Sequence, residues 1–325
     1  MEKNIYNKKE VKLREDLCEI KKNSDCKNKI DIYYKQINSI IPHKKSISSL
    51  SIFPLGNIIS VSFDKSIKIF DNNLNIIQTI LNAHDNCIIY VCIKDENNFV
   101  TSSYKNIKTW IKNKGDDFSL NQTINNAHDD WINKIIYYLN GNLISCSHDK
   151  KIKIWEKDNN KYQCITILTH NNWVYSILLL KDINILISSG LDRIKFWNLN
   201  NFENIINLKA ICYNSNALKR IDKERIIIGG KYDGIIKIIS IKEKKIVKEI
   251  KNKFKCFGIC IFQEKGIFLI GGRSEEIKIY KIDNYECIKI IENAHNDIIL
   301  GINKLKNHLI ASYGEDRTIK IWSIQ

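Results

Sequence analysis

A strand–turn–strand signal recurs seven times along the 325-residue chain at a nearly constant spacing. The segment at 145–155, SCSHDKKIKIW, shows it well, with two short β-type runs on either side of a turn at Asp149. The seven turn positions are Asp64, Lys105, Asp149, Asp192, Asp233, Glu275 and Asp316, which are 41, 44, 43, 41, 42 and 41 residues apart. A fixed period of this length is typical of repeat architectures, in which each unit completes its core against its neighbours.

Each unit also has an upstream half. Five of the turn positions are preceded by a histidine 21 or 22 residues earlier: His43, His84, His128, His170 and His295. Apolar runs such as WINKIIYY and WVYSILLL follow the histidine, and alternating runs such as KYQCITIL come before the next one. Four short β-rich segments therefore fill each period, and very little of the repeat region has the period of a helix. The sequence predicts an all-β protein.

The order and spacing of these signals resemble those of the WD40 repeat family. The match is degenerate, because Ala or Thr precedes the histidine (NAH, LTH) and none of the unit-ending Trp residues is followed by Asp (WEK, WNL, WSI). The resemblance implies a seven-bladed β-propeller over residues 30–325, with four antiparallel strands per blade. The last unit ends after its third strand. We therefore expect the alternating run at 31–40, DIYYKQINSI, to supply the fourth and to close the ring.

The resemblance also implies a buried hydrogen-bond network in each complete blade, in which Trp donates to a hydroxyl, the hydroxyl to His, and His to Asp. Three units have all four residues: His128, Ser145, Asp149 and Trp155; His170, Ser188, Asp192 and Trp197; and His295, Ser312, Asp316 and Trp322. A Ser/His/Asp set resembles a catalytic triad, but its repetition favours a structural role. The fifth and sixth units have no histidine, and we expect their blades to be the softest.

Partner-binding residues are expected on the face around the central channel. In the family, this face takes side chains from three and five residues after the histidine and from the position before the turn Asp. The aromatic candidates at these positions are Phe63, Tyr104, Trp131, His148, Trp173, Tyr175 and Tyr232. Asn133, Leu191, Ser274 and Glu315 occupy four further positions of this set. Aromatic side chains are enriched at the centres of protein interfaces, so a peptide or partner protein is the expected ligand.

Charge and cysteine content limit the other functions. The formal net charge is +15, but the lysines are scattered, so nucleic-acid binding is kept as an alternative. A Lys stands two residues before the end of every unit, as at Lys153, which indicates a framework position on the third strand. The ten cysteines include no CxxC pair, which favours reduced thiols in the cytoplasm or nucleus and gives no sign of a metal or cofactor. No apolar run approaches 18 residues, so membrane insertion is not expected.

The predicted function is a non-enzymatic scaffold that brings proteins together. A narrower alternative, a substrate receptor of a ubiquitin ligase, has no residue that favours it. His148 and His308 lie outside the repeated histidine position and have no evident nucleophile beside them. Residues 1–29 form a charged extension, which is either a short helix with Leu13, Leu17 and Ile20 on one face or a disordered tail.

Overall fold

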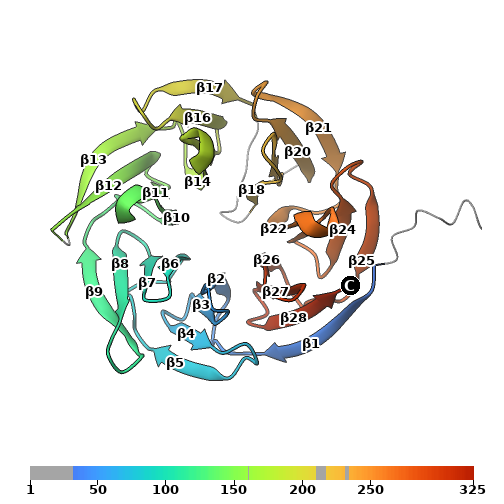
Figure 1. Ribbon diagram of the computed structural model, residues 1–325, viewed down its shortest axis with the longest axis horizontal. Helices are drawn as coiled ribbons and strands as arrows, with labels where there is room; N and C mark the ends of the chain where they lie inside the picture. Colours follow the sequence, from blue (N-terminus) through green and yellow to red (C-terminus); the bar gives the residue numbers. More distant parts are fainter. Residues whose placement is uncertain (1–31, 160, 210–216, 231–233) are drawn as a thin grey trace, which may run out of the picture. The chain divides into compact units, whose positions relative to one another are not determined.

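The computed structural model describes residues 32–159, 161–209, 217–230 and 234–325. The predicted extension at 1–29 lies outside these residues. Residues 34–325 form one compact unit of seven four-stranded antiparallel sheets. Figure 1 shows the seven sheets arranged as blades around a central axis, in the order of the sequence. The prediction of an all-β, seven-bladed propeller is confirmed.

The blades are numbered along the chain, and each is given from its innermost to its outermost strand. Blade 1 comprises β2 (Ile47–Ile52), β3 (Ile58–Ser62), β4 (Ile67–Phe70) and β5 (Ile76–Ile80). Blade 2 comprises β6 (Tyr90–Asp95), β7 (Asn98–Ser102), β8 (Ile107–Lys112) and β9 (Phe118–Ile124). Blade 3 comprises β10 (Ile132–Tyr137), β11 (Leu143–Ser147), β12 (Lys151–Asp158) and β13 (Lys161–Thr169). Blade 4 comprises β14 (Val174–Leu180), β15 (Ile185–Gly190), β16 (Ile194–Asn198) and β17 (Asn204–Leu208).

The remaining three blades follow the same order. Blade 5 comprises β18 (Leu218–Arg220), β19 (Arg225–Ile228), β20 (Ile235–Ser240) and β21 (Lys245–Lys251). Blade 6 comprises β22 (Cys256–Phe262), β23 (Ile267–Gly272), β24 (Ile277–Lys281) and β25 (Cys287–Ile291). Blade 7 comprises β26 (Ile299–Lys304), β27 (Leu309–Gly314), β28 (Ile319–Ile324) and β1 (Tyr34–Ile40). Short 3-10 turns, η1 (Leu139–Gly141), η2 (Lys181–Ile183) and η3 (Gln263–Lys265), follow the innermost strands of blades 3, 4 and 6.

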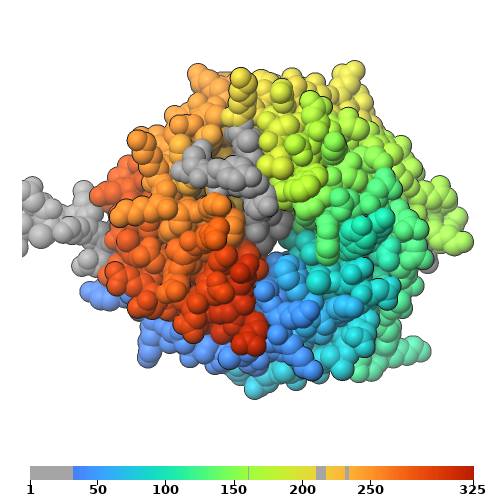
Figure 2. All heavy atoms as spheres, turned by 180° about the vertical axis from the view of Figure 1, so that it is seen from behind, coloured from blue at the N-terminus to red at the C-terminus, as the bar shows by residue number. Residues whose placement is uncertain are grey.

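The ring is closed by the two ends of the propeller unit. β1 pairs antiparallel with β28, with Tyr34 opposite Ile324 and Ile40 opposite Ile319. The blue β1 lies beside the red β28 in Figure 1, and blue and red spheres meet again in the view from behind in Figure 2. Residues 34–40 of the run predicted at 31–40 therefore supply the outer strand of the last blade, as the sequence predicts. Closure covers the edge of β28 that would otherwise be exposed.

The apolar core lies between the blades. Second strands such as β3 and β11 are buried at every residue, because a neighbouring blade covers each face of the sheet. Outer strands such as β21 are instead mostly exposed, with two half-buried residues among seven. One core cluster joins Phe70 of blade 1 to Tyr313 of blade 7, and both side chains are 0% exposed. Burying a side chain of this size contributes about 1.5–3 kcal/mol, so each blade is stabilised chiefly by its neighbours.

Candidate functional site

The buried histidines link the loop before each innermost strand to the turn between the second and third strands. In blade 3, Nδ1 of His128 is 2.8 Å from Oδ2 of Asp149. Nε2 of the same ring is 2.7 Å from Oγ of Ser145, which also accepts a 2.8 Å bond from the indole N–H of Trp155. A carboxylate can only accept, so Nδ1 carries the proton and Nε2 accepts from the hydroxyl. Donors and acceptors therefore match along the whole chain of bonds.

Blades 4 and 7 repeat this arrangement. In blade 4, His170 Nδ1 is 2.8 Å from Asp192 Oδ1 and Nε2 is 2.7 Å from Ser188 Oγ, which accepts from Trp197 at 2.7 Å. In blade 7, the three corresponding distances are 2.8, 2.6 and 2.8 Å for His295, Ser312, Asp316 and Trp322. The serines are fully buried. None of these hydroxyls has the open side that a nucleophile needs.

Burial sets the charge state of the networks. It lowers the pKa of His128 below its ordinary value, and the hydrogen bond to Asp149 opposes this shift without reversing it. Burial would raise the pKa of Asp149, but hydrogen bonds from His128 and from backbone N–H groups lower it to about 2. The ring is therefore neutral and the carboxylate ionised near neutral pH. This is the protonation state that the bond directions require.

Blades 1 and 2 carry partial networks. In blade 1, His43 contacts Ser60 at 2.8 Å and Asp64 at 3.1 Å, but Phe70 replaces the Trp. In blade 2, Nε2 of His84 is 2.8 Å from Thr101 Oγ1, which accepts from Trp110 at 2.8 Å, while Lys105 stands at the turn. Burial, with the charge of Lys108 nearby, lowers the pKa of His84 to about 3.

One supporting side chain of the networks was missed in the sequence. A hydroxyl two residues after the turn Asp joins the network in blades 1 and 7, where Ser66 Oγ lies 2.9 Å from His43 Nδ1 and Thr318 Oγ1 lies 3.0 Å from His295 Nδ1. The Asp-x-Ser/Thr spacing was the available signal, because an Asp side chain bonds the backbone two residues on. The third-strand lysine also has a partner: Lys153 Nζ donates at 2.7 Å to the carbonyl of Ala127, next to His128.

In blades 5 and 6, glycine occupies the place of the network serine. A Cβ at Gly229 would lie 2.8 Å from Cβ and Sγ of Cys256 in blade 6, and one at Gly271 would lie 2.7 Å from Cγ2 of Ile299 in blade 7. The next blade therefore packs directly where the histidine and hydroxyl would stand. Glycine at these two positions therefore permits a close approach between blades, because each faces an apolar contact.

Rings predicted to bind partners come together across blades 2, 3 and 4. The ring of Tyr104 lies 5.0 Å from that of Trp131, and the ring of His148 lies 4.5 Å from that of Trp173 at an interplanar angle of 18°. A backbone bond of 2.9 Å from His148 N to the Trp131 carbonyl ties the two pairs together. We call Tyr104, Trp131, His148 and Trp173 the aromatic strip. Its most accessible member is Trp173, which is 39% exposed.

The structure corrects the sequence for some of the other candidates. Tyr175 is only 5% exposed, because its ring lies edge-on against His148 and Trp173, so it supports the strip from beneath. Asn133 bonds the carbonyl of Val174 at 2.7 Å and joins blade 3 to blade 4. Phe63 is half-buried in blade 1. Tyr104 stacks on Trp131 of the following blade, but the residue at that place after Phe63 is Cys87, which has no ring. Tyr232 lies outside the described residues.

His148 has an unusual environment within the strip. Its Nε2 is buried and has no hydrogen-bond partner among the described residues. Burial lowers the pKa of His148, and the charge of Asp130 opposes that shift. The surface that this part of the strip presents is therefore the exposed indole of Trp173, which lies on the imidazole. An exposed, supported indole suits contact with an apolar or aromatic side chain.

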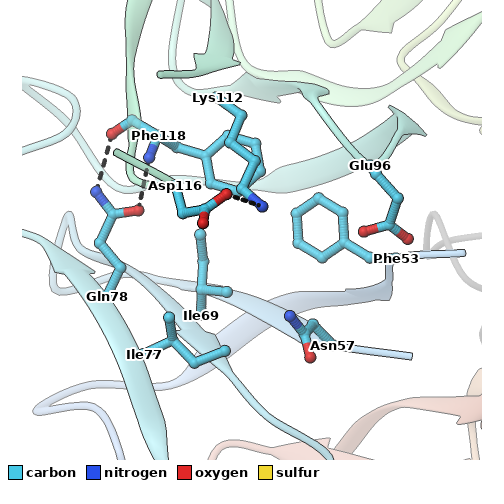
Figure 3. A pocket seen from close by; sticks show the side chains of 9 residues that line it. All are labelled: Phe53, Asn57, Ile69, Ile77, Gln78, Glu96, Lys112, Asp116 and Phe118. Carbon is cyan, nitrogen blue, oxygen red and sulfur yellow. Dashed lines mark hydrogen bonds and ion pairs between the residues drawn. The ribbon is translucent and has the colours of Figure 1, made fainter. Parts of the chain in front are cut away.

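A cavity lies between blades 1 and 2. It has a volume of about 220 Å³ and a floor of Phe53, Ile69, Ile77 and Phe118. Figure 3 shows Gln78 at one side, where its side-chain amide pairs with the backbone of Phe118 through two bonds of 2.9 Å. Lys112 and Asp116 form an ion pair of 2.9 Å at the rim. These polar groups are already paired, so the side chains around the cavity chiefly connect the two blades.

The described residues contain no group of three or more His, Cys, Asp or Glu side chains placed to hold a metal ion. Within the same residues, no helical segment has the length and apolar character that a bilayer crossing requires.

The fold and its repeated networks define a class: a closed ring of blades with a His–hydroxyl–Asp–Trp bond chain. The family model described as WD domain, G-beta repeat matches residues 34–71, 119–156 and 285–323. Each match begins in or next to an outer strand and ends in or just past the third strand of the following blade, so a sequence repeat is offset by one strand from a blade. The chain is a WD40-repeat β-propeller. A search of curated proteins found no match.

Proposed function

We propose that this propeller is a non-enzymatic scaffold whose protein partner docks on the aromatic strip. WD40 propellers generally bind other proteins, and the placement on the strip is specific to this chain. The observation that carries it is the stack of Trp173 on His148, in which an exposed indole covers a buried nitrogen without a described partner. Aromatic side chains held rigid by their neighbours bind with little loss of conformational entropy.

The strip also has a favourable shape and charge. It crosses three adjacent blades, so an extended peptide segment can contact several loops at once. Lys105 Nζ lies 5.1 Å from the centre of the Tyr104 ring at one end, while Asp130 lies close enough to His148 to affect its pKa. We infer a partner segment with an apolar or aromatic side chain that packs on the exposed ring of Trp173.

Affinity purification from the native cell tests this proposal. The wild-type chain is compared with the double variant Trp131→Ala and Trp173→Ala. A control variant, Ile165→Ala and Ile167→Ala, removes apolar side chains that are 47% and 49% exposed on the outer strand β13 of blade 3. Loss of a partner from the Trp variant alone, with an unchanged melting temperature, supports the strip. An unaltered list of partners would contradict the proposal. Loss of the same partner from both variants would indicate an interface on the outer rim of the propeller instead.

Nucleic acid is the second candidate partner, and the observation in its favour is the net charge of +15 together with Lys105 beside Tyr104. RNA or DNA binding that weakens steeply with salt and is lost in the Trp131→Ala, Trp173→Ala variant would favour it over a protein partner. The partners recovered would also show whether ubiquitin-ligase subunits are among them. We further propose a cytoplasmic or nuclear location, because the cysteines of the described residues are free thiols, two of them exposed.

A further inference from the structure

The cavity between blades 1 and 2 is lined by two polar groups that the connection between the blades does not use (Figure 3). Glu96 is half-buried, and its Oε1 accepts a hydrogen bond from the backbone N–H of Leu55. Its Oε2 has no hydrogen bond to any described residue. The side-chain amide of Asn57 likewise has no hydrogen-bond partner within the described part of the chain. Both groups are therefore available to a ligand.

The lining has one charge that no neighbour balances. Lys112 and Asp116 neutralise each other through their 2.9 Å ion pair. Among the described residues, no basic side chain comes within ion-pair distance of Glu96. The cavity is thus locally acidic in a chain whose net charge is +15. A half-buried carboxylate beside an apolar surface attracts a cation more strongly than an exposed one, because water and salt screen it less.

The floor of the cavity is apolar and aromatic. The rings of Phe53 and Phe118 are stacked with their centres 5.4 Å apart, and Ile69 and Ile77 complete the floor. The volume of about 220 Å³ is below the range of about 300–1,000 Å³ that is usual for small-molecule sites. The cavity therefore suits one long side chain better than a whole cofactor or metabolite.

We propose that this cavity binds an arginine or lysine side chain of a protein partner. The aliphatic part of the side chain would pack on the floor, and its charged end would pair with Oε2 of Glu96. The free amide of Asn57 would contact the backbone of the same partner segment. Arginine is the better fit, because its guanidinium group is less strongly hydrated than an ammonium group and stacks on aromatic rings.

This site lies at the opposite end of the blades from the aromatic strip. In blade 2, Glu96 precedes β7, whereas Tyr104 of the strip follows it. Lys112 and Phe118 flank the loop after β8, whereas Tyr104 comes before that strand. A five-residue strand such as β7 spans about 17 Å, so the two sites can hold different partner segments at the same time. The inference adds a second binding face to the scaffold and does not rest on the strip.

NMR titration of the isotope-labelled full chain with the capped tripeptide Gly-Arg-Gly tests the proposal. Saturable shifts of the Gln78 side-chain amide and of the Phe118 N–H are expected, and the capped tripeptide Gly-Leu-Gly should cause none. Glu96→Gln should weaken binding about tenfold, because the charge is lost while the bond from Leu55 is kept. Glu292→Gln removes the same charge from an exposed position after β25 and should bind as the wild type does.

Two further comparisons place the binding in the cavity. Ile77→Ala removes part of the floor and should weaken binding, whereas Ile76→Ala changes a neighbour of similar exposure outside the lining and should not. The variant Trp131→Ala, Trp173→Ala should bind the tripeptide as the wild type does, so failure of the strip and failure of this site can be told apart.

Three results would overturn the proposal. They are the absence of saturable shifts, equal binding of Gly-Leu-Gly, and an equal loss of binding in Glu96→Gln and Glu292→Gln, which would show diffuse attraction. The capped tripeptide Gly-Lys-Gly serves as a final probe. Equal binding of the lysine and arginine tripeptides would show that charge selects the side chain, and tighter binding of arginine would show that its planar group contributes. Either result supports a basic side chain as the occupant.

Discussion

The imidazole of His148 in blade 3 lies against the indole of Trp173 in blade 4, with ring centres 4.5 Å apart and planes inclined by 18°. Two further contacts fix this pair. His148 N donates to the carbonyl of Trp131, and Leu191 N donates to the carbonyl of Trp173 at 3.0 Å. Each residue is thus held by the backbone of its own blade, and its ring packs on a ring of the adjacent blade, which makes the stack a rigid surface.

Replacing His148 with Phe tests whether the buried nitrogen serves binding. Phe keeps an aromatic ring against Trp173 but removes Nε2, which has no partner among the described residues. An unsatisfied buried polar atom costs about 1–3 kcal/mol, so His148→Phe should raise the free energy of unfolding by about 1 kcal/mol in urea titrations. The same variant should bind the strip's partner as the wild type does, because Phe keeps a ring under Trp173. A variant that is less stable than the wild type, or that loses the partner, would show that Nε2 has a role of its own.

The repeat period was enough to predict the blades, because each turn residue is fixed by local chemistry within its own unit. Ring closure could also be inferred, since the run that contains β1 had no unit of its own. The exposure of individual aromatic rings, in contrast, could not be predicted from the repeats. Tyr175 is buried because Trp173 and His148 lie over it, and these come from two blades. Likewise, nothing in the sequence indicated that Lys94, Lys134, Lys181 and Lys219 line one pocket, because they belong to four different blades.

Blade 2 lacks only the turn carboxylate of a complete network. His84, Thr101 and Trp110 already form their bonds, and Lys105 stands where blades 3, 4 and 7 have Asp. Lys105→Asp should therefore stabilise the protein by about 1 kcal/mol near pH 7 and raise the pKa of His84, because a carboxylate beside Nδ1 favours the protonated ring. Urea unfolding and NMR titration of the ring measure the two effects. Lys105→Ala is the control, and equal stability of the two variants would contradict the prediction.

Gln78 connects blade 1 to blade 2 through two hydrogen bonds to the backbone of Phe118. Gln78→Glu retains the shape of the side chain but cannot donate to the Phe118 carbonyl, and it places a negative charge beside that oxygen. We expect a loss of about 1–3 kcal/mol in the free energy of unfolding. Thr79→Ala, at the exposed neighbouring position, should change stability by less than about 0.5 kcal/mol. Similar losses in the two variants would show that the amide pair contributes nothing specific.

The buried histidines should make the protein sensitive to mild acid. In the folded state, burial lowers the pKa values of His43, His84, His128 and His170 below the unfolded value of 6.5, to about 3 for His84. Below pH 6.5 the unfolded chain therefore binds protons that the folded chain does not bind. The free energy of unfolding is highest above pH 6.5 and decreases as the pH falls below that value. Each histidine contributes a slope of at most about 1.4 kcal/mol per pH unit between its two pKa values.

Urea unfolding between pH 7.5 and 4.5 measures this slope. His84→Gln should make it shallower across that range, because Gln does not titrate. His308→Gln removes an exposed histidine and should leave the slope as it is in the wild type. An unchanged slope in His84→Gln would contradict the prediction. It would mean that the ring is protonated in the folded protein and that another group compensates for the lost hydration of its charge.

The pairing of β1 with β28 makes the stability of every blade depend on residues 34–40. A chain that starts at residue 41 loses the outer strand of blade 7, and the edge of β28 becomes exposed. Each blade is covered by its neighbours, so we expect the loss to spread around the ring as a fall of at least about 10 °C in the melting temperature. A chain that starts at residue 32 keeps the strand and is the matched comparison. Adding a peptide of residues 32–41 to the shortened chain should restore part of the difference, while equal melting temperatures for the two chains would show that the ring is held without this strand.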